Sequence, residues 1–349
     1  MKHGLCVIGY GGMGGWHVNH ALNSDVVELI GVYDIKEERN LAAQVKGIMA
    51  YRSLEEVLAD PKVEIVTIAI PNDEHESVAI RCMEAGKNII SEKPVTLSVA
   101  SLDRMTAVSV KNSVKFSVHQ NRRWDVDYLA VKELFENDTI GRIFNIESRI
   151  HGSRGIPSDW RGVKKFGGGM LYDWGVHLID QVMMLFNAQK LVSVFCEFDH
   201  ITNKEVDDGF KLTLHFDTGS RAYIEVGTYN FIAMPRFYIQ GERGTGLLTD
   251  WRENCHVTEC FAWYESDVIP VQTAAGLTKT MAPRDEITTK SYDLDRPISD
   301  VHDYYRNFCS AVEGKGTQLV THAQMRRVLK VIEAAFASVE RNQVISYSE

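Results

Sequence analysis

Residues 5–14 read LCVIGYGGMG, an apolar run that ends in the glycine pattern G-x-G-x-x-G. A strand pattern precedes the glycines and a helical pattern follows them, which is the context that a dinucleotide-binding loop requires. Gly9 allows a tight turn, Gly11 lets a pyrophosphate approach the backbone, and Gly14 lets the helix pack on the strand. An ordinary glycine turn is the alternative, and the strand–loop–helix context favours dinucleotide binding. The loop residues predicted to contact the cofactor are Gly9, Tyr10, Gly11, Gly12, Met13 and Gly14.

A carboxylate follows the second strand pattern, where such a loop needs one. Asp34 lies twenty residues after Gly14, the position at which an acidic side chain binds the ribose hydroxyls of NAD and repels the extra phosphate of NADP. Asp34 and Glu37 also fit a capping box for the next helix, and one oxygen can cap while the other binds ribose. Arg39 is close enough to weaken the discrimination. We predict NAD, with NADP less favoured, and expect Ile35 and Arg39 beside the cofactor.

Periodicity divides the chain into two parts. Strand and helix patterns alternate over residues 1–120, which is typical of a doubly wound parallel sheet of Rossmann type. In residues 121–349, period-two runs such as Phe210–Phe216 predict a mainly antiparallel sheet. We therefore predict an α/β fold with an NAD-binding domain at 1–120 and an α+β domain at 121–349. A helix is expected from about Asp173 to Phe186, and residues 264–298 are expected to form a long loop.

Composition excludes several classes of protein. The 349 residues carry 38 Lys and Arg against 47 Asp and Glu, a net charge of −9 without a basic block, which argues against nucleic-acid binding. No apolar run reaches the ~18 residues of a membrane helix, and the N-terminal apolar run is too short for a signal peptide. The six cysteines are scattered without a C-x-x-C pair, which suits reduced thiols in the cytoplasm. Cys255, His256 and Cys260 lie in a strand pattern without a second ligand pair, so no metal site is predicted.

Two segments carry residues suited to chemistry. Glu92-Lys93-Pro94 follows a predicted parallel strand, at the sheet edge where ligands bind, and a lysine there can stabilise a developing oxyanion. By itself, Lys93 is better explained as a surface residue. In the later helix, Asp173 and His177 share one face of an otherwise apolar helix. We expect Asp173 to orient a neutral His177 that can take a proton, with a satisfied core histidine as the alternative.

Four segments together resemble the Gfo/Idh/MocA family, which is named after glucose–fructose oxidoreductase and inositol dehydrogenase. They are the glycine loop, Glu92-Lys93-Pro94, Asn121-Arg122-Arg123, and residues 167–180, which read GGGMLYDWGVHLID. The resemblance covers essentially the whole chain. It implies a Rossmann domain followed by a domain with a large open sheet, and nicotinamide-dependent oxidation or reduction of sugars, sugar derivatives and inositols.

The resemblance also implies roles for individual residues. Lys93, Asp173 and His177 match the catalytic lysine, aspartate and histidine. Beyond the loop and Asp34, the cofactor is expected to contact Ile70, Pro71, Asn72, His75, Glu92, Lys93, Asn121, Trp160 and Arg161. The substrate is expected to contact Lys93, Arg122, Arg154, Trp160, Asp173 and His177.

The reaction expected is reversible hydride transfer at a secondary alcohol of a sugar, sugar derivative or inositol, with His177 as proton acceptor and Lys93 stabilising the oxygen. One alternative is oxidation of an intact glycoside at ring C3, with NAD retained and recycled. A second is a non-catalytic nucleotide-sensing or partner-binding protein, because fold does not determine function. The expected mark of that alternative is loss of Lys93 or His177, and both residues are present.

Two expectations concern assembly and the long loop. The resemblance implies a homo-oligomer, a dimer or tetramer, built through the C-terminal sheet. Within residues 264–298, Lys279 and Arg284 are hypothesised to donate hydrogen bonds at an active-site mouth, either in their own chain or in a neighbouring subunit, and a solvated excursion is the alternative.

Overall fold

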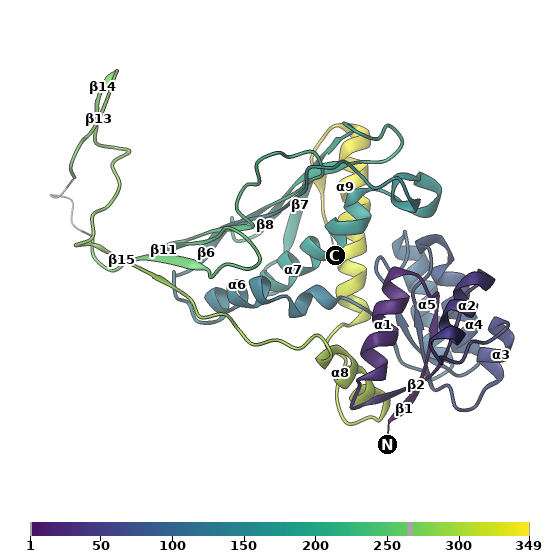
Figure 1. Cartoon of the computed structure of the whole chain (residues 1–349). Coiled ribbons are helices and arrows are strands. Elements are labelled where there is room, and N and C mark those ends of the chain that lie inside the picture. The colour runs from purple at the N-terminus through teal and green to yellow at the C-terminus, as the bar shows by residue number, and fades with distance from the viewer. Residues whose placement is uncertain (1, 264–267, 349) are drawn as a thin grey trace.

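The structure is a computed structural model that describes residues 2–263 and 268–348 (Figure 1). Among these residues, the N-terminal sheet has five parallel strands in the order β2-β1-β3-β4-β5, and the predicted Rossmann topology is confirmed. Its strands are β1 (His3–Ile8), β2 (Val27–Tyr33), β3 (Ile65–Ile68), β4 (Asn88–Ser91) and β5 (Phe116–Val118). Its helices are α1 (Gly12–Leu22), α2 (Glu37–Val45), α3 (Leu54–Ala59), α4 (His75–Glu84) and α5 (Val99–Lys111), with short 3-10 turns η1 (Asn72–Glu74) and η2 (Asn121–Trp124).

The larger sheet has nine strands in the described part of the chain, in the order β15-β12-β11-β10-β6-β9-β8-β7-β16. Neighbouring strands are antiparallel except β6 and β9, which are parallel, so the prediction of a mainly antiparallel sheet is confirmed. The strands are β6 (Ile143–His151), β7 (Leu191–Asp199), β8 (Gly209–Phe216), β9 (Arg221–Gly227), β10 (Phe237–Gly241), β11 (Gly244–Leu248), β12 (His256–Cys260), β15 (Thr289–Asp293) and β16 (Ile345–Ser346).

Helices cover one face of this sheet. They are α6 (Val126–Glu136), α7 (Val176–Leu185) and α9 (His322–Arg341), and the long α9 stands beside β7, between this sheet and the N-terminal domain, in Figure 1. Along β8 the alternate residues Phe210, Leu212 and Leu214 are fully buried beneath them. Because side chains alternate along a strand, the other face carries the polar residues between these positions. The short 3-10 turns η3 (Trp160–Gly162) and η4 (Lys164–Phe166) lie in the loop that leads to α7.

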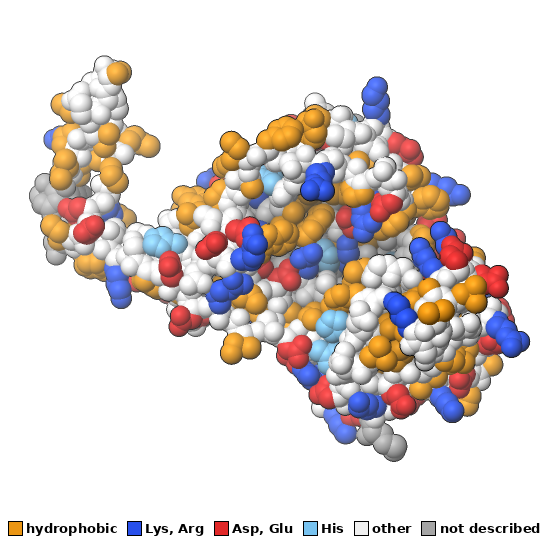
Figure 2. All heavy atoms as spheres, viewed as in Figure 1, with side chains coloured by type: hydrophobic (Ala, Val, Ile, Leu, Met, Phe, Trp, Pro, Cys, Tyr) orange, Lys and Arg blue, Asp and Glu red, His pale blue; other side chains and the backbone are white. Residues whose placement is uncertain are grey.

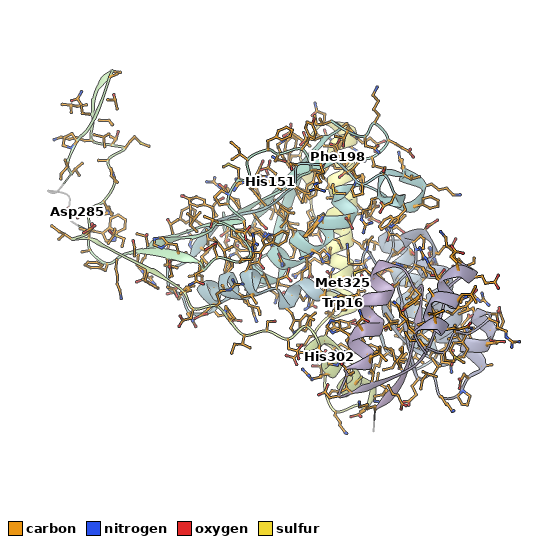
Figure 3. All side chains as sticks on the ribbon, viewed as in Figure 1. Trp16, His151, Phe198, Asp285, His302 and Met325 are labelled. Atoms are coloured by element: carbon orange, nitrogen blue, oxygen red, sulfur yellow. The ribbon has the colours of Figure 1, made fainter. Side chains whose placement is uncertain are left out.

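The helix α8 (Asp303–Val312) returns to the N-terminal sheet. His302, which precedes α8, shares a 2.7 Å hydrogen bond with Ser24 Oγ. Its ring stacks against the His20 ring of α1. Arg306 pairs with Asp25. Figure 3 labels His302 and Trp16 where α8 approaches α1. A segment distant in sequence therefore helps to hold the helix that follows the glycine loop.

Residues 264–298 differ from the predicted structureless loop. They contain the hairpin β13 (Val271–Thr273) and β14 (Gly276–Thr278) and the edge strand β15, while residues 264–267 lie outside the described part. Strands this short carry little periodic signal, and β15 is stabilised by pairing with β12 rather than by its own pattern. The hairpin projects beyond the sheet, away from α1, and Figure 2 shows hydrophobic side chains along it.

The position of the hairpin is relevant to the hypothesis that Lys279 and Arg284 lie at an active-site mouth. Asp285, labelled in Figure 3, marks the base of the projecting segment. The Arg284 guanidinium lies 4.1 Å from the centroid of the Trp263 ring, within the same segment. Lys279 and Arg284 therefore do not reach the site of their own chain, and contact with a neighbouring subunit's site stays a prediction.

The segment that carries the expected helix from Asp173 also differs. Leu171–Gly175 forms a π-helical turn, η5, and α7 begins only at Val176. Asp207 lies beneath this turn, where its Oδ2 accepts the Leu171 N–H at 2.8 Å and its backbone carbonyl accepts the Met170 N–H at 3.1 Å. A Cβ on Gly169, whose φ is +109°, would lie 2.1 Å from Asp207 Oδ1. Close packing of Asp207 therefore fixes the start of the turn.

Asp207 makes stability depend on pH. Burial raises the pKa of Asp207 to about 8, whereas an unfolded aspartate titrates near 3.9. A raised folded-state pKa favours folding fully below the unfolded value, and that stability is lost as pH rises toward 8. Asp207→Asn keeps the oxygen for Leu171 and removes the titration. We expect the variant's gain in Tm over wild type to be larger at about pH 7.5 than at about pH 4.5; equal gains would show that Asp207 is already ionised in the folded protein.

Candidate active site

The glycine loop leaves open space at the start of α1. A Cβ on Gly14 would lie 1.7 Å from the Gly9 carbonyl oxygen, so Gly14 is required for close packing. A Cβ on Gly12 would meet nothing within 4 Å, and the N-cap Gly11 offers no side-chain cap. The first N–H groups of α1 therefore face an open cradle, which fits the pyrophosphate of a dinucleotide. Met13 lies at this end of the helix and is partly exposed.

Asp34 closes the cradle on the side of β2. Its Oδ2 accepts the Tyr10 N–H at 2.7 Å and pairs with Arg39 Nη1 at 3.0 Å, while its Oδ1 accepts the Lys36 N–H at 2.9 Å. The alternative of a capping box is wrong, because α2 begins at Glu37 with Lys36 as N-cap and no side-chain cap. A carboxylate has about four acceptor positions, so Asp34 keeps capacity for a ribose hydroxyl. Ile35 beside it is exposed.

Lys93 and Asp173 meet across the two parts of the chain. Lys93 Nζ donates to the Asp173 backbone oxygen at 2.7 Å and to its Oδ1 at 3.0 Å. Arg161 Nε donates to Asp173 Oδ2 at 3.1 Å. Burial opposes ionisation of this carboxyl, but Lys93 and Arg161 hold the pKa of Asp173 below its ordinary value. Two cations therefore share one buried carboxylate, and Arg161 in turn lies over the Trp160 ring at 4.5 Å.

His177 is buried next to this cluster and is held by a different residue. Its Nδ1 lies 3.1 Å from Gln120 Oε1, and the Gln120 amide nitrogen donates to the sulfur of Met325 at 3.5 Å. The amide oxygen accepts, so Nδ1 carries the proton and Nε2 keeps its lone pair. No hydrogen bond between described residues engages Nε2. Burial, with Lys93 and Arg122 nearby, holds the pKa of His177 well below its usual range, so the ring is neutral.

The expectation that Asp173 orients His177 is wrong. Both Asp173 oxygens are taken by Lys93 and Arg161, because a carboxylate bonds more strongly to cations than to a neutral imidazole. Gln120 performs the orienting role instead. The spacing of Asp173 and His177 on a regular helix carried no information about partners that arrive from the other part of the chain.

Glu92 lies behind the lysine in a buried polar network. Its Oε1 accepts from His17 Nε2 at 2.7 Å and from His119 Nδ1 at 2.9 Å, and His17 Nδ1 lies 2.5 Å from the hydroxyl of Tyr305. Burial opposes ionisation, but the two histidines hold the pKa of Glu92 well below its usual range, while burial lowers the pKa of His17 to about 4. The same three side chains have atoms close enough to ligate a metal, but those atoms are already hydrogen-bonded to one another.

The other residues predicted to contact the cofactor lie on the segments that follow β3 and β5. Asn72 Nδ2 donates to the Gly167 carbonyl at 3.2 Å, and His75 bridges the carbonyls of Ile70 and Pro94 at 3.0 and 2.9 Å. Asn72 and His75 are both buried and bond to backbone carbonyls, so they hold the neighbouring loops in place, and their contact with a cofactor stays a prediction. Pro71 is exposed next to Asn72, and Asn121 begins η2 directly after Gln120.

Two predicted residues stand apart from the cluster. The Glu92 carboxylate is enclosed by histidines, so a contact between Glu92 and a cofactor would have to use its backbone. Arg154 is exposed, and no hydrogen bond or ion pair joins it to another described residue. Sequence reasoning did not single out the chemistry of Gln120, His17 and Asp207, because their local patterns look like ordinary polar positions.

The fold and the site together define a two-domain, dinucleotide-binding oxidoreductase. A family profile described as "Oxidoreductase family, NAD-binding Rossmann fold" matches residues 4–120, and one described as "GFO/IDH/MocA C-terminal domain" matches residues 128–246. The chain belongs to the Gfo/Idh/MocA family, and the resemblance drawn from its sequence motifs is confirmed.

Several relatives are similar over long stretches. The solved structure of an NAD-binding protein from Listeria innocua has a TM-score of 0.96 and 43% identity, and the match covers 99% of each chain. A scyllo-inositol 2-dehydrogenase (NADP(+)) of Bacillus subtilis is 26% identical, over 97% of this chain and 94% of that protein. An uncharacterized oxidoreductase of Schizosaccharomyces pombe is 31% identical over 61% of this chain. The chain spans 62% of that relative's length. Within the described residues, no helix is long and apolar enough to cross a membrane.

Proposed function

We propose that this chain catalyses reversible hydride transfer between a nicotinamide cofactor and a secondary alcohol of a sugar, sugar derivative or inositol. One observation carries the proposal: a buried, neutral His177, held through Nδ1 by Gln120, keeps Nε2 free beside the Lys93 ammonium. Both residues lie with the glycine loop at the carboxyl edge of the N-terminal sheet, where open α/β sheets bind ligands. Residues 1–120 would hold the cofactor and residues 121–349 the alcohol.

His177, Lys93 and Asp173 have different roles in the proposed reaction. Nε2 of His177 takes the hydroxyl proton, and a low pKa suits it to return that proton in the reverse direction. Lys93 donates to the same oxygen and stabilises its negative charge. Asp173 holds the ammonium in place through two hydrogen bonds. Bound nicotinamide would supply the hydride acceptor for the carbinol carbon.

The charge balance and the relatives support a neutral polyol substrate. Lys93 pairs with Asp173, Arg161 pairs with both Asp173 and Asp159, and Arg122 pairs with Asp125 at 2.8 Å. The three cations around His177 therefore face three carboxylates. They act as hydrogen-bond donors for hydroxyl groups. The Bacillus subtilis relative is named for an inositol substrate, which agrees with a ring polyol here.

For the cofactor we propose NAD in preference to NADP. Asp34 presents a carboxylate at the end of β2, and Arg39 offsets part of its charge through their ion pair. Free thiols at all six cysteines support a location in the cytoplasm.

Removing the proton acceptor tests the mechanism. We expect His177→Ala or Lys93→Ala to lower kcat about 10²–10⁴-fold, while the Kd for NAD, measured by fluorescence quenching, changes little. The control is His256→Ala, which removes an exposed histidine on β12, next to the edge strand β15. A loss below roughly tenfold in His177→Ala would return His177 to the role of a core histidine.

Changing the ribose carboxylate tests the cofactor. We expect Asp34→Ala to raise the ratio of kcat/KM for NADP over NAD about tenfold or more, because a repulsive charge near the extra phosphate is removed. Arg39→Ala should lower the same ratio. Glu38→Ala, an exposed acid on the same helix, is the matched control. A wild-type enzyme that prefers NADP would contradict the proposal.

We also propose that copies pair through the polar face of the larger sheet. That face carries a shallow pocket of about 320 Å³ lined by Glu147, Arg149, Thr213 and Tyr223, among others. The helices α6, α7 and α9 pack on the opposite face. Light scattering at micromolar concentration should give a multiple of the monomer mass, and a monomer would refute the pairing.

A further inference from the structure

An aromatic surface extends from the proton acceptor toward the larger sheet. Trp174, in the π-helical turn, has its ring centroid 6.2 Å from the His177 ring. Trp251, in the turn between β11 and β12, lies 5.8 Å from Trp174 with the ring planes tilted by 53°. The Arg122 guanidinium is 4.1 Å from the Trp174 centroid and 5.9 Å from that of Trp251. We call the two tryptophans the aromatic platform, and Arg122 lies against both rings.

The platform is held in place by specific contacts. The Arg122 carbonyl accepts from Gln181 Nε2 at 2.8 Å, and its guanidinium pairs with Asp125. The turn that carries Trp251 is clamped by Arg296, whose guanidinium donates to the Trp251 carbonyl at 3.1 Å and to that of Arg252. Trp251 is nonetheless 37% exposed. A large aromatic side chain that is anchored through its backbone and still open to solvent is suited to bind a ligand.

The chemistry of the platform selects a ring. A six-membered cyclic polyol carries its equatorial hydroxyls around the rim and its axial C–H groups on the faces, so each face is apolar. The negative face of an indole ring attracts such C–H groups, while Lys93 and Arg161 can donate to hydroxyls on the rim. An open-chain alditol lacks a continuous apolar face and would lose most of this contact.

We propose that Trp251, together with Trp174, forms a stacking subsite that selects cyclic over open-chain polyols, with Trp251 as a specificity-determining residue. The inference rests on the proposed dehydrogenase function and deepens it. The Arg122 guanidinium, already neutralised by Asp125 and stacked on Trp174, supports the platform rather than a carboxylate of the substrate. The subsite therefore favours neutral rings over sugar acids.

The test measures NAD-linked oxidation of myo-inositol, glucose and sorbitol by wild type and by Trp251→Ala, Trp251→Phe and Val110→Ala. For the preferred cyclic substrate, Trp251→Ala should raise KM about tenfold, the scale of a lost aromatic contact, and should lower kcat less than it raises KM. Trp251→Phe should retain most of the affinity. Val110→Ala removes an exposed apolar side chain on α5, away from the platform, and should leave the kinetics unchanged.

The outcomes separate the two proposals. An unchanged KM in Trp251→Ala, with the Kd for NAD at the wild-type value to show a folded site, would overturn the stacking subsite alone. Equal kcat/KM for sorbitol and the cyclic substrates in wild type would also overturn it. Absence of turnover with all three polyols in wild type would instead overturn the proposed function.

Discussion

The buried carboxylate of Glu92 joins the chain segments on which the site depends. It accepts hydrogen bonds from His17 of α1 and from His119 at the end of β5, and it immediately precedes Lys93. His119 in turn immediately precedes Gln120, which holds His177. A buried charge is costly unless it is fully paired, so these segments cannot shift independently without exposing or unpairing Glu92. The cradle, the lysine and the proton acceptor therefore share one anchor.

The charges on Lys93, Arg161 and Asp173 determine which group next to the reacting oxygen donates a hydrogen bond and which accepts a proton. Asp173 is bound by Lys93 and Arg161 and stays ionised, which keeps the lysine ammonium fixed. His177, excluded from that carboxylate, stays neutral because burial and the same cations disfavour its protonation. The two groups thus offer a donor and an acceptor side by side, the arrangement that reversible alcohol oxidation needs.

Segments far along the chain complete the site. Tyr305 of α8 contacts His17, and Met325 of α9 fixes the orientation of Gln120. Arg296, between β15 and α8, holds the turn that carries Trp251. The C-terminal helices therefore do more than cover the larger sheet, because they position polar groups in the N-terminal part. Burial of Asp207 beneath the π-helical turn lowers the free energy of unfolding near neutral pH, since the carboxyl stays protonated in the folded protein.

Local pattern was sufficient for the Rossmann topology, the antiparallel sheet and the glycine cradle, because strand and helix periods and glycine geometry are properties of short segments. The motifs also brought Lys93, Asp173 and His177 to attention. Their partners could not be read in the same way. These partners are Gln120 on His177, the two cations on Asp173, the histidines on Glu92, and Trp251 beside Trp174. They lie at least twelve residues from the groups that they hold, and competition among charges determines which pair forms. The π-helical turn and the short strands β13–β15 were missed for a related reason, since packing by Asp207 and pairing with β12 stabilise them against a weak local signal.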